Sequence, residues 1–133
     1  MPPIGWSFWA DAYNCKVCPD ENKVVFDWAI QAVKEAGLHP VGVVAHDFPV
    51  EKHPGLSGAS IIELVIKLEE SHFAVHTWPE YGLVCVDIFT CGDYASAEKA
   101  MDKFLANFQP GHVERGGDPR GNLLQAALWA VTK

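Results

Sequence analysis

The sequence has no cluster of basic residues and no long apolar run. Its formal net charge is −7, with 10 Lys and Arg against 17 Asp and Glu, which argues against nucleic acid or an anionic membrane surface as a partner. No segment approaches the roughly 18 apolar residues of a membrane-spanning helix, and the first residues lack the pattern of a secretory leader. We therefore expect a cytoplasmic protein with neither nucleic acid nor membrane as its partner.

The sequence lacks a complete set of motifs for a zinc site. The chain has 4 cysteines, of which Cys15 and Cys18 form a CxxC pair. No second CxxC supplies the two further ligands that a structural zinc ion needs. We therefore expect no metal, and free thiols in a reducing compartment.

The spacing of apolar residues predicts one α+β domain over residues 1–133. Hydrophobic residues make up 49% of the chain and charged residues 20%, as is typical of globular proteins. Helices are predicted where one apolar stripe follows helical spacing, at 21–36 and 93–108. Strands are predicted at 4–14, 39–48, 60–68, 72–76, 83–90 and 112–115. This order predicts a two-layer sandwich, an antiparallel sheet with both main helices on one face, while the apolar tail 123–131 fits either helix or strand.

The reactive side chains gather in residues 69–92, on two strands that are predicted to form a hairpin around a Pro-centred turn. Antiparallel pairing would bring Ser71 close to Cys91, and Ser71, His76 and Cys91 are predicted to share one pocket. A hydrolase could use such a trio with Asp87 as the orienting residue, although no Gly-x-Ser-x-Gly elbow is present. On spacing alone, purely structural roles for the three residues remain open.

Three motifs stand at fixed spacing in this stretch: ESH at 70–72, HTWPEYG at 76–82 and VDIFTCG at 86–92. The combination is far more specific than any one of them, and it resembles the prokaryotic, pyruvoyl-dependent S-adenosylmethionine decarboxylase proenzymes. The resemblance implies a self-cleaving decarboxylase that makes the aminopropyl donor for spermidine. It also implies a homodimer of cleaved protomers with sites near the interface.

The resemblance assigns the cleavage to Glu70 and Ser71. The Ser71 hydroxyl would attack the Glu70 carbonyl, and β-elimination from the resulting ester would separate residues 1–70 from residues 71–133. The second fragment would then begin with a covalent pyruvoyl group made from Ser71. Such a group takes up the electrons left by lost carbon dioxide, as a bound cofactor otherwise would.

Five further roles follow from the same resemblance. His76 is implied to assist the processing as a proton acceptor. Cys91 is implied to protonate the product carbon, which suits a thiol because it is protonated yet acidic near neutral pH. Phe48 and Trp78 match the aromatic residues around the adenine, and Glu80 matches the carboxylate that binds the ribose hydroxyls.

Two departures from the family pattern leave the substrate open. The family has a Ser-Gly pair close before the processing serine, and its hydroxyl lines the site. Here Ser57, the matching candidate for substrate binding, lies 14 residues before Ser71, with Glu63 nearer the expected place. A histidine that the family often has in its first strand is also absent. The alternatives are a pyruvoyl-dependent decarboxylase of arginine or ornithine, and an uncleaved, non-catalytic homologue.

Overall fold

The computed structural model describes residues 3–48, 61–69, 71–91 and 94–131, and for residues 47, 48 and 61–63 it describes the backbone only. The strands are β1 (Pro3–Tyr13), β2 (Pro40–Phe48), β3 (Ile61–Leu68), β4 (Ser71–Trp78), β5 (Leu83–Thr90) and β6 (His112–Asn122). The helices are α1 (Asn22–Glu35), α2 (Tyr94–Ala106) and α3 (Leu123–Val131), with a short 3-10 helix at Pro79–Tyr81. The predicted α+β class and all the predicted main elements are confirmed.

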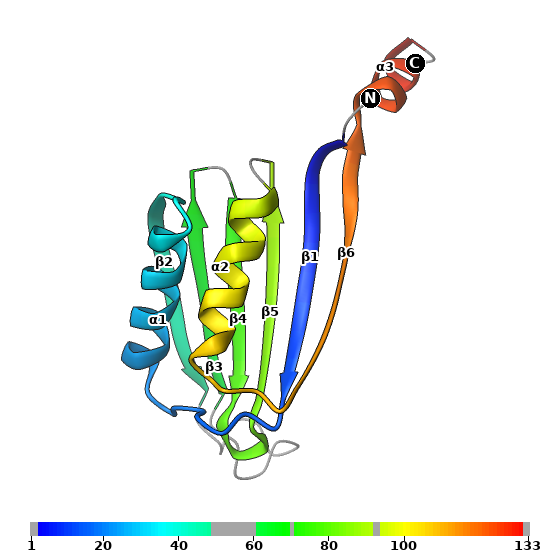
Figure 1. Cartoon of the computed structure of the whole chain (residues 1–133). Helices are drawn as coiled ribbons and strands as arrows, with labels where there is room; N and C mark the ends of the chain where they lie inside the picture. The colour runs from blue at the N-terminus through cyan, green and yellow to red at the C-terminus, as the bar shows by residue number, and fades with distance from the viewer. Residues whose placement is uncertain (1–2, 49–60, 70, 92–93, 132–133) are drawn as a thin grey trace.

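The strands form one antiparallel sheet in the order β2-β3-β4-β5-β1-β6. Helices α1 and α2 pack together and cover one face of it, as predicted (Figure 1). The chain reverses at Gly37, whose φ of +85° is favourable for glycine, and then enters β2.

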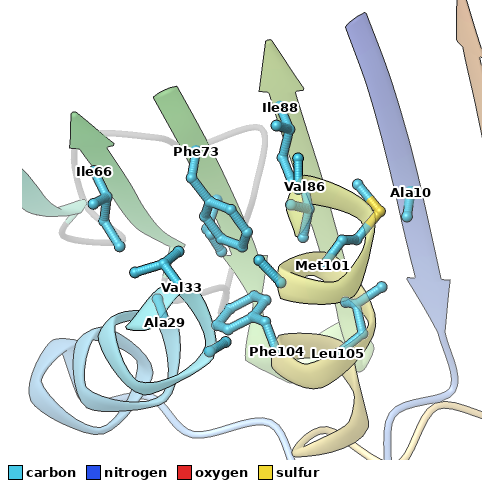
Figure 2. Packing of buried hydrophobic residues seen from close by; sticks show 14 of the residues in the cluster. Ala10, Ala29, Val33, Ile66, Phe73, Val86, Ile88, Met101, Phe104 and Leu105 are labelled. Atoms are coloured by element: carbon cyan, nitrogen blue, oxygen red, sulfur yellow. The ribbon is translucent and has the colours of Figure 1, made fainter. Parts of the chain in front are cut away.

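The core lies between the two helices and the sheet (Figure 2). Phe73 of β4 and Phe104 of α2 are fully buried, with ring centroids 5.4 Å apart in an edge-to-face arrangement. Because side chains alternate along a strand, every second residue of β4 enters this core, while His72 and His76 face the other way. That second face, which we call the open face, carries no helix among the described residues (Figure 1).

The predicted last strand is present, but β6 is much longer than the predicted 112–115, so its predicted end is wrong. The expected break at Gly116 and Gly117 does not occur, because both glycines lie against aromatic residues of β1. A Cβ atom on Gly116 would be 3.0 Å from the Trp9 ring, and one on Gly117 would be 2.7 Å from the Phe8 Cβ. The glycines therefore let β6 lie close to β1.

Helix α3 resolves the ambiguity of the apolar tail in favour of helix. It follows β6 directly and lies beyond the end of the sheet, away from α1 and α2 (Figure 1). All its residues are exposed, including Leu124, Leu128 and Trp129. Among the described residues, no helix is long and apolar enough to cross a membrane.

Candidate active site

Ser71 is the first residue of β4 and directly follows the turn from β3. Ser71 is only 6% exposed, and its hydroxyl oxygen is buried with no hydrogen-bond partner among the described residues. Leaving a buried hydroxyl without a partner costs about 1–3 kcal/mol, so the position calls for an explanation beyond packing. Ser71 therefore has a buried hydroxyl that no group among the described residues binds.

The end of β5 lies next to Ser71. Thr90 is directly opposite Ser71 in the β4–β5 pair, and Cys91 is the next residue. Cys91 is exposed, whereas Thr90 is buried. The predicted proximity of the Ser71 and Cys91 segments is confirmed by this register.

Within one chain, His76 lies far from Ser71 and Cys91. It is five residues from Ser71 along the same strand, a distance of about 17 Å at 3.3 Å per residue. Since side chains alternate, residues five positions apart also face opposite sides of the sheet. His76 is on the open face, opposite Cys85. Within one chain, the structure therefore does not bring His76 together with Ser71 and Cys91, and a shared pocket of the three residues stays a prediction.

The two described substrate-binding candidates lie at the His76 end of β4. The Trp78 ring is half-buried and stacks on the His76 ring, with centroids 6.1 Å apart and an angle of 19° between planes. Glu80 is exposed in the 3-10 helix that follows. Gly82 closes this turn with a φ of +58°, and its carbonyl accepts a 3.0 Å hydrogen bond from the Cys15 backbone. His76, Trp78 and Glu80 thus form one group, far from Ser71.

The structure does not describe the side chains of three other candidate residues. Ser57 and Glu70 lie outside the described residues, and so does the side chain of Phe48, the last residue of β2. Their roles stay predictions.

Partial burial raises the pKa of two cysteines, which favours their neutral thiol form. Burial, followed by the nearby Asp11, raises the pKa of Cys85 to about 12. Burial, followed by Cys15, raises the pKa of Cys18 to about 11. Because the thiolate is the nucleophilic form, neither residue is suited to attack a substrate at neutral pH.

The arrangement does not build a Ser-His-Asp hydrolase within one chain. Asp87 lies opposite Ala74 on β4, whereas the residue opposite His76 is Cys85. His72 and His76 have HxxxH spacing, but on a strand their positions are about 13 Å apart. No group of three or more His, Cys, Asp or Glu side chains among the described residues could hold a metal ion.

Sequence reasoning missed two residues, one that contacts Ser71 and one that contacts the strand opposite it. The Lys67 ammonium on β3 donates hydrogen bonds to the carbonyl oxygens of Leu68 and Ser71, the latter at 3.4 Å. The signal for it was a lone lysine in the otherwise apolar end of a strand, VIKL. Gly5 of β1 lies so close to the end of β5 that a Cβ atom would be 2.7 Å from the Thr90 carbonyl oxygen.

The fold is that of a two-layer α+β protein, with a buried serine after a turn and a cysteine next to the residue opposite that serine. Comparison with known proteins identifies the family. A family model for S-adenosylmethionine decarboxylase matches residues 7–121. A relative from Archaeoglobus fulgidus, an S-adenosylmethionine decarboxylase proenzyme, is 42% identical over 90 residues, 68% of this chain and 72% of that protein. One of the same name from Acidithiobacillus ferrooxidans is 35% identical over 124 residues, 92% of this chain and 86% of that protein.

A solved structure agrees with the sequence comparisons. The crystal structure of the adenosylmethionine decarboxylase from Aquifex aeolicus matches with a TM-score of 0.77 at 28% identity, covering 92% of this chain and 95% of that one. The chain belongs to the S-adenosylmethionine decarboxylase family.

Proposed function

We propose that this chain is a self-processing enzyme that decarboxylates S-adenosylmethionine and supplies the aminopropyl donor for spermidine biosynthesis. Membership of the family supports the activity. The observation that carries the proposal is the Ser71 hydroxyl, buried at the start of β4 and without a hydrogen-bond partner among the described residues. Because no described group binds this hydroxyl, it can rotate toward the preceding carbonyl that it is proposed to attack.

The processing step makes a cofactor from the chain itself. The Ser71 Oγ adds to the Glu70 carbonyl carbon, the peptide C–N bond breaks, and the hydroxyl proton passes to the nitrogen, which gives an ester. Elimination from that ester and hydrolysis then leave a pyruvoyl group at the start of residues 71–133. The site fits this product, because the Ser71 side chain becomes a methyl group and loses the hydroxyl that is buried without a partner among the described residues. When formed, the group supplies an electron sink for decarboxylation.

From the separation of the candidate residues we infer that each site includes a second copy of the chain. Ser71 and Cys91 lie at one end of β4 and β5, and His76, Trp78 and Glu80 lie toward the other end. Within one chain the two sets are therefore far apart. Two chains packed through their open faces, running in opposite directions, would bring the Ser71 end of β4 in one chain to the His76 end of β4 in its partner, once the Ser71 side chain turns from the helix-covered face to the open face.

The composition of the open face supports this homodimer. Trp9 and Tyr13 of β1 are 40% and 39% exposed there, which is unusual for large aromatic side chains and common at interfaces. Each site of the dimer would combine Ser71 and Cys91 of one chain with His76, Trp78 and Glu80 of its partner.

The roles of the substrate-binding residues follow from their chemistry. The Trp78 and Phe48 rings stack on the adenine, Glu80 accepts hydrogen bonds from the ribose hydroxyls, and Ser57 contributes a hydroxyl to the site. Cys91 is exposed and directly follows Thr90, the residue opposite Ser71. It donates a proton to the product carbon. A cytoplasmic location stays a prediction.

One observation favours a second candidate, the decarboxylation of arginine or ornithine. Glu63 lies directly opposite His76 in the β3–β4 pair, so an additional acidic residue stands beside the proposed substrate group. A carboxylate at this position would favour a basic amino acid.

Two measurements decide between these functions. Denaturing mass spectrometry of the purified protein tests the processing, and a single uncleaved chain of 14.6 kDa that is stable on incubation would leave only a non-catalytic homologue. Release of carbon dioxide from carboxyl-labelled S-adenosylmethionine, arginine and ornithine, assayed in parallel, tests the substrate. Activity on the amino acids alone would select the second candidate.

A further inference from the structure

We propose that Lys67 promotes the self-cleavage by stabilising negative charge on the Ser71 carbonyl oxygen while the ester is eliminated. The inference rests on the proposed function, since it concerns the cleavage at Glu70–Ser71. Lys67 lies near the end of β3, opposite His72 of β4. Its ammonium reaches over the end of the hairpin and binds the carbonyl oxygens of Leu68 and Ser71.

The elimination step needs a positive charge at this oxygen. A base removes the proton on the Ser71 Cα, the Cβ–Oγ bond breaks, and Glu70 leaves as a carboxylate. The electron pair of the Cα–H bond becomes the Cα=Cβ double bond of dehydroalanine. As the proton leaves, negative charge develops on the adjacent Ser71 carbonyl oxygen. Dehydroalanine then tautomerises, and water hydrolyses it with release of ammonia to give the pyruvoyl group.

The Lys67 ammonium is placed for that charge before the reaction begins. It lies 3.4 Å from the Ser71 oxygen, and its second bond, to Leu68, fixes it across the turn. A charge held in place in this way stabilises a developing oxyanion without reorganisation. Removing one such donor commonly slows a reaction by about 100-fold or more; since this bond is long, we expect roughly 10- to 100-fold.

Glu69, the acidic residue of the turn that the structure describes, makes its contacts away from Lys67. The Glu69 carboxylate lies 3.7 Å from the His39 imidazole, and the Glu69 backbone N–H donates a 3.0 Å hydrogen bond to the His39 carbonyl. These contacts direct Glu69 toward the start of β2. The ammonium therefore binds carbonyl oxygens on both sides of the cleavage position.

The test separates ester formation from ester elimination. Freshly purified wild type, Lys67→Met, Lys67→Gln and Lys67→Arg are incubated and sampled, and each sample is divided with and without hydroxylamine before denaturing mass spectrometry. Hydroxylamine cleaves the ester, which has the same mass as the intact chain, and leaves a serine at residue 71. Elimination leaves a pyruvoyl group, and simple hydrolysis of the ester leaves a serine without hydroxylamine.

We expect Lys67→Met and Lys67→Gln to accumulate the ester, to eliminate it roughly 10- to 100-fold more slowly, and to yield more fragment that begins with serine. Lys67→Arg should restore most of the elimination because it keeps the positive charge. Lys23→Met is the matched control, because Lys23 is an exposed lysine on α1 that pairs with Asp27, and it should behave as wild type.

Other outcomes overturn the inference. Wild-type rates and products in Lys67→Gln would do so, as would equal slowing of both steps with no ester, which is the mark of a merely structural role. A failure of Lys67→Arg to restore elimination would also count against it, provided that thermal unfolding shows this variant to be folded. Failure of the proposed function looks different, since the wild type itself would then never cleave.

Discussion

Gly5 and Thr90 approach each other more closely than any other residue type at position 5 would allow. A Cβ atom on Gly5 would lie 2.7 Å from the Thr90 carbonyl oxygen and 3.0 Å from the Phe89 ring. Thr90 is opposite Ser71 and precedes Cys91. The absence of a side chain on β1 thus sets the position of the end of β5, where the proposed site lies.

Replacing Gly5 with alanine should disturb this end of the sheet. Since the obstructing atom is a backbone oxygen, the strand itself must shift, and we expect a loss of about 1–3 kcal/mol in the free energy of unfolding. Urea unfolding measures it, in a Ser71→Ala background so that the chain stays intact. Gly42→Ala is the control, because its Cβ would meet only the Lys67 Cβ at 3.9 Å. Equal free energies of unfolding for the two variants would show that β5 can shift without loss of stability.

The cysteines should differ in their reactivity toward iodoacetamide. The raised pKa values of Cys18, about 11, and Cys85, about 12, mean that both stay protonated at mildly alkaline pH. The pKa of Cys15 is also raised, by burial. We expect exposed Cys91 to be alkylated first and the other three slowly, as measured by peptide mass mapping of the Ser71→Ala chain over time. Modification of Cys85 as fast as Cys91 would contradict the burial that raises its pKa.

Substituting Cys91 should separate the two reactions of the protein. In Cys91→Ala we expect cleavage at Glu70–Ser71 to continue, because the thiol takes no part in forming or eliminating the ester. Release of carbon dioxide from S-adenosylmethionine should fall by about 10²-fold or more, the usual contribution of a general acid. Cys18→Ala, which changes a cysteine outside the site, serves as the control. Equal loss of cleavage and decarboxylation in Cys91→Ala would remove the role given to Cys91.

The fold could be predicted from the sequence because each main element carries its own periodicity. The stripe of α2 and the alternation in β4 and β5 depend on residues close together in the chain, and the sheet with its two covering helices follows from their order. The length of β6 could not be predicted in this way. Gly116 and Gly117 are read locally as strand breakers, yet they are there to accommodate Trp9 and Phe8, about a hundred residues earlier in the chain.

The site was only partly predictable, for reasons of geometry. The hairpin register places Ser71 beside the Cys91 segment, because in an antiparallel pair the start of the first strand lies next to the end of the second. Within one chain His76 lies apart from them, and its odd separation from Ser71 already put it on the other face of the strand. The contact of Lys67 with Ser71 depends on where a flexible side chain reaches across a turn, which no periodicity reports.

The division of the residues between two chains predicts complementation between two inactive variants. Ser71→Ala lacks the nucleophile, and His76→Ala lacks the residue proposed to assist processing, so neither should cleave efficiently alone. In a mixed dimer, Ser71 of the His76→Ala chain would meet His76 of the Ser71→Ala chain. We expect coexpression to restore cleavage of the His76→Ala chain only, as shown by mass spectrometry of differently tagged chains.

A double variant supplies the control for this experiment. A Ser71→Ala/His76→Ala chain can form the same dimer but offers no histidine to its partner, so it should leave the His76→Ala chain uncleaved. The alternative, in which His76 serves Ser71 of its own chain, demands movement of about 17 Å along β4. It would be supported only if the His76→Ala chain stayed intact with the Ser71→Ala partner while size exclusion showed that the mixed dimer had formed.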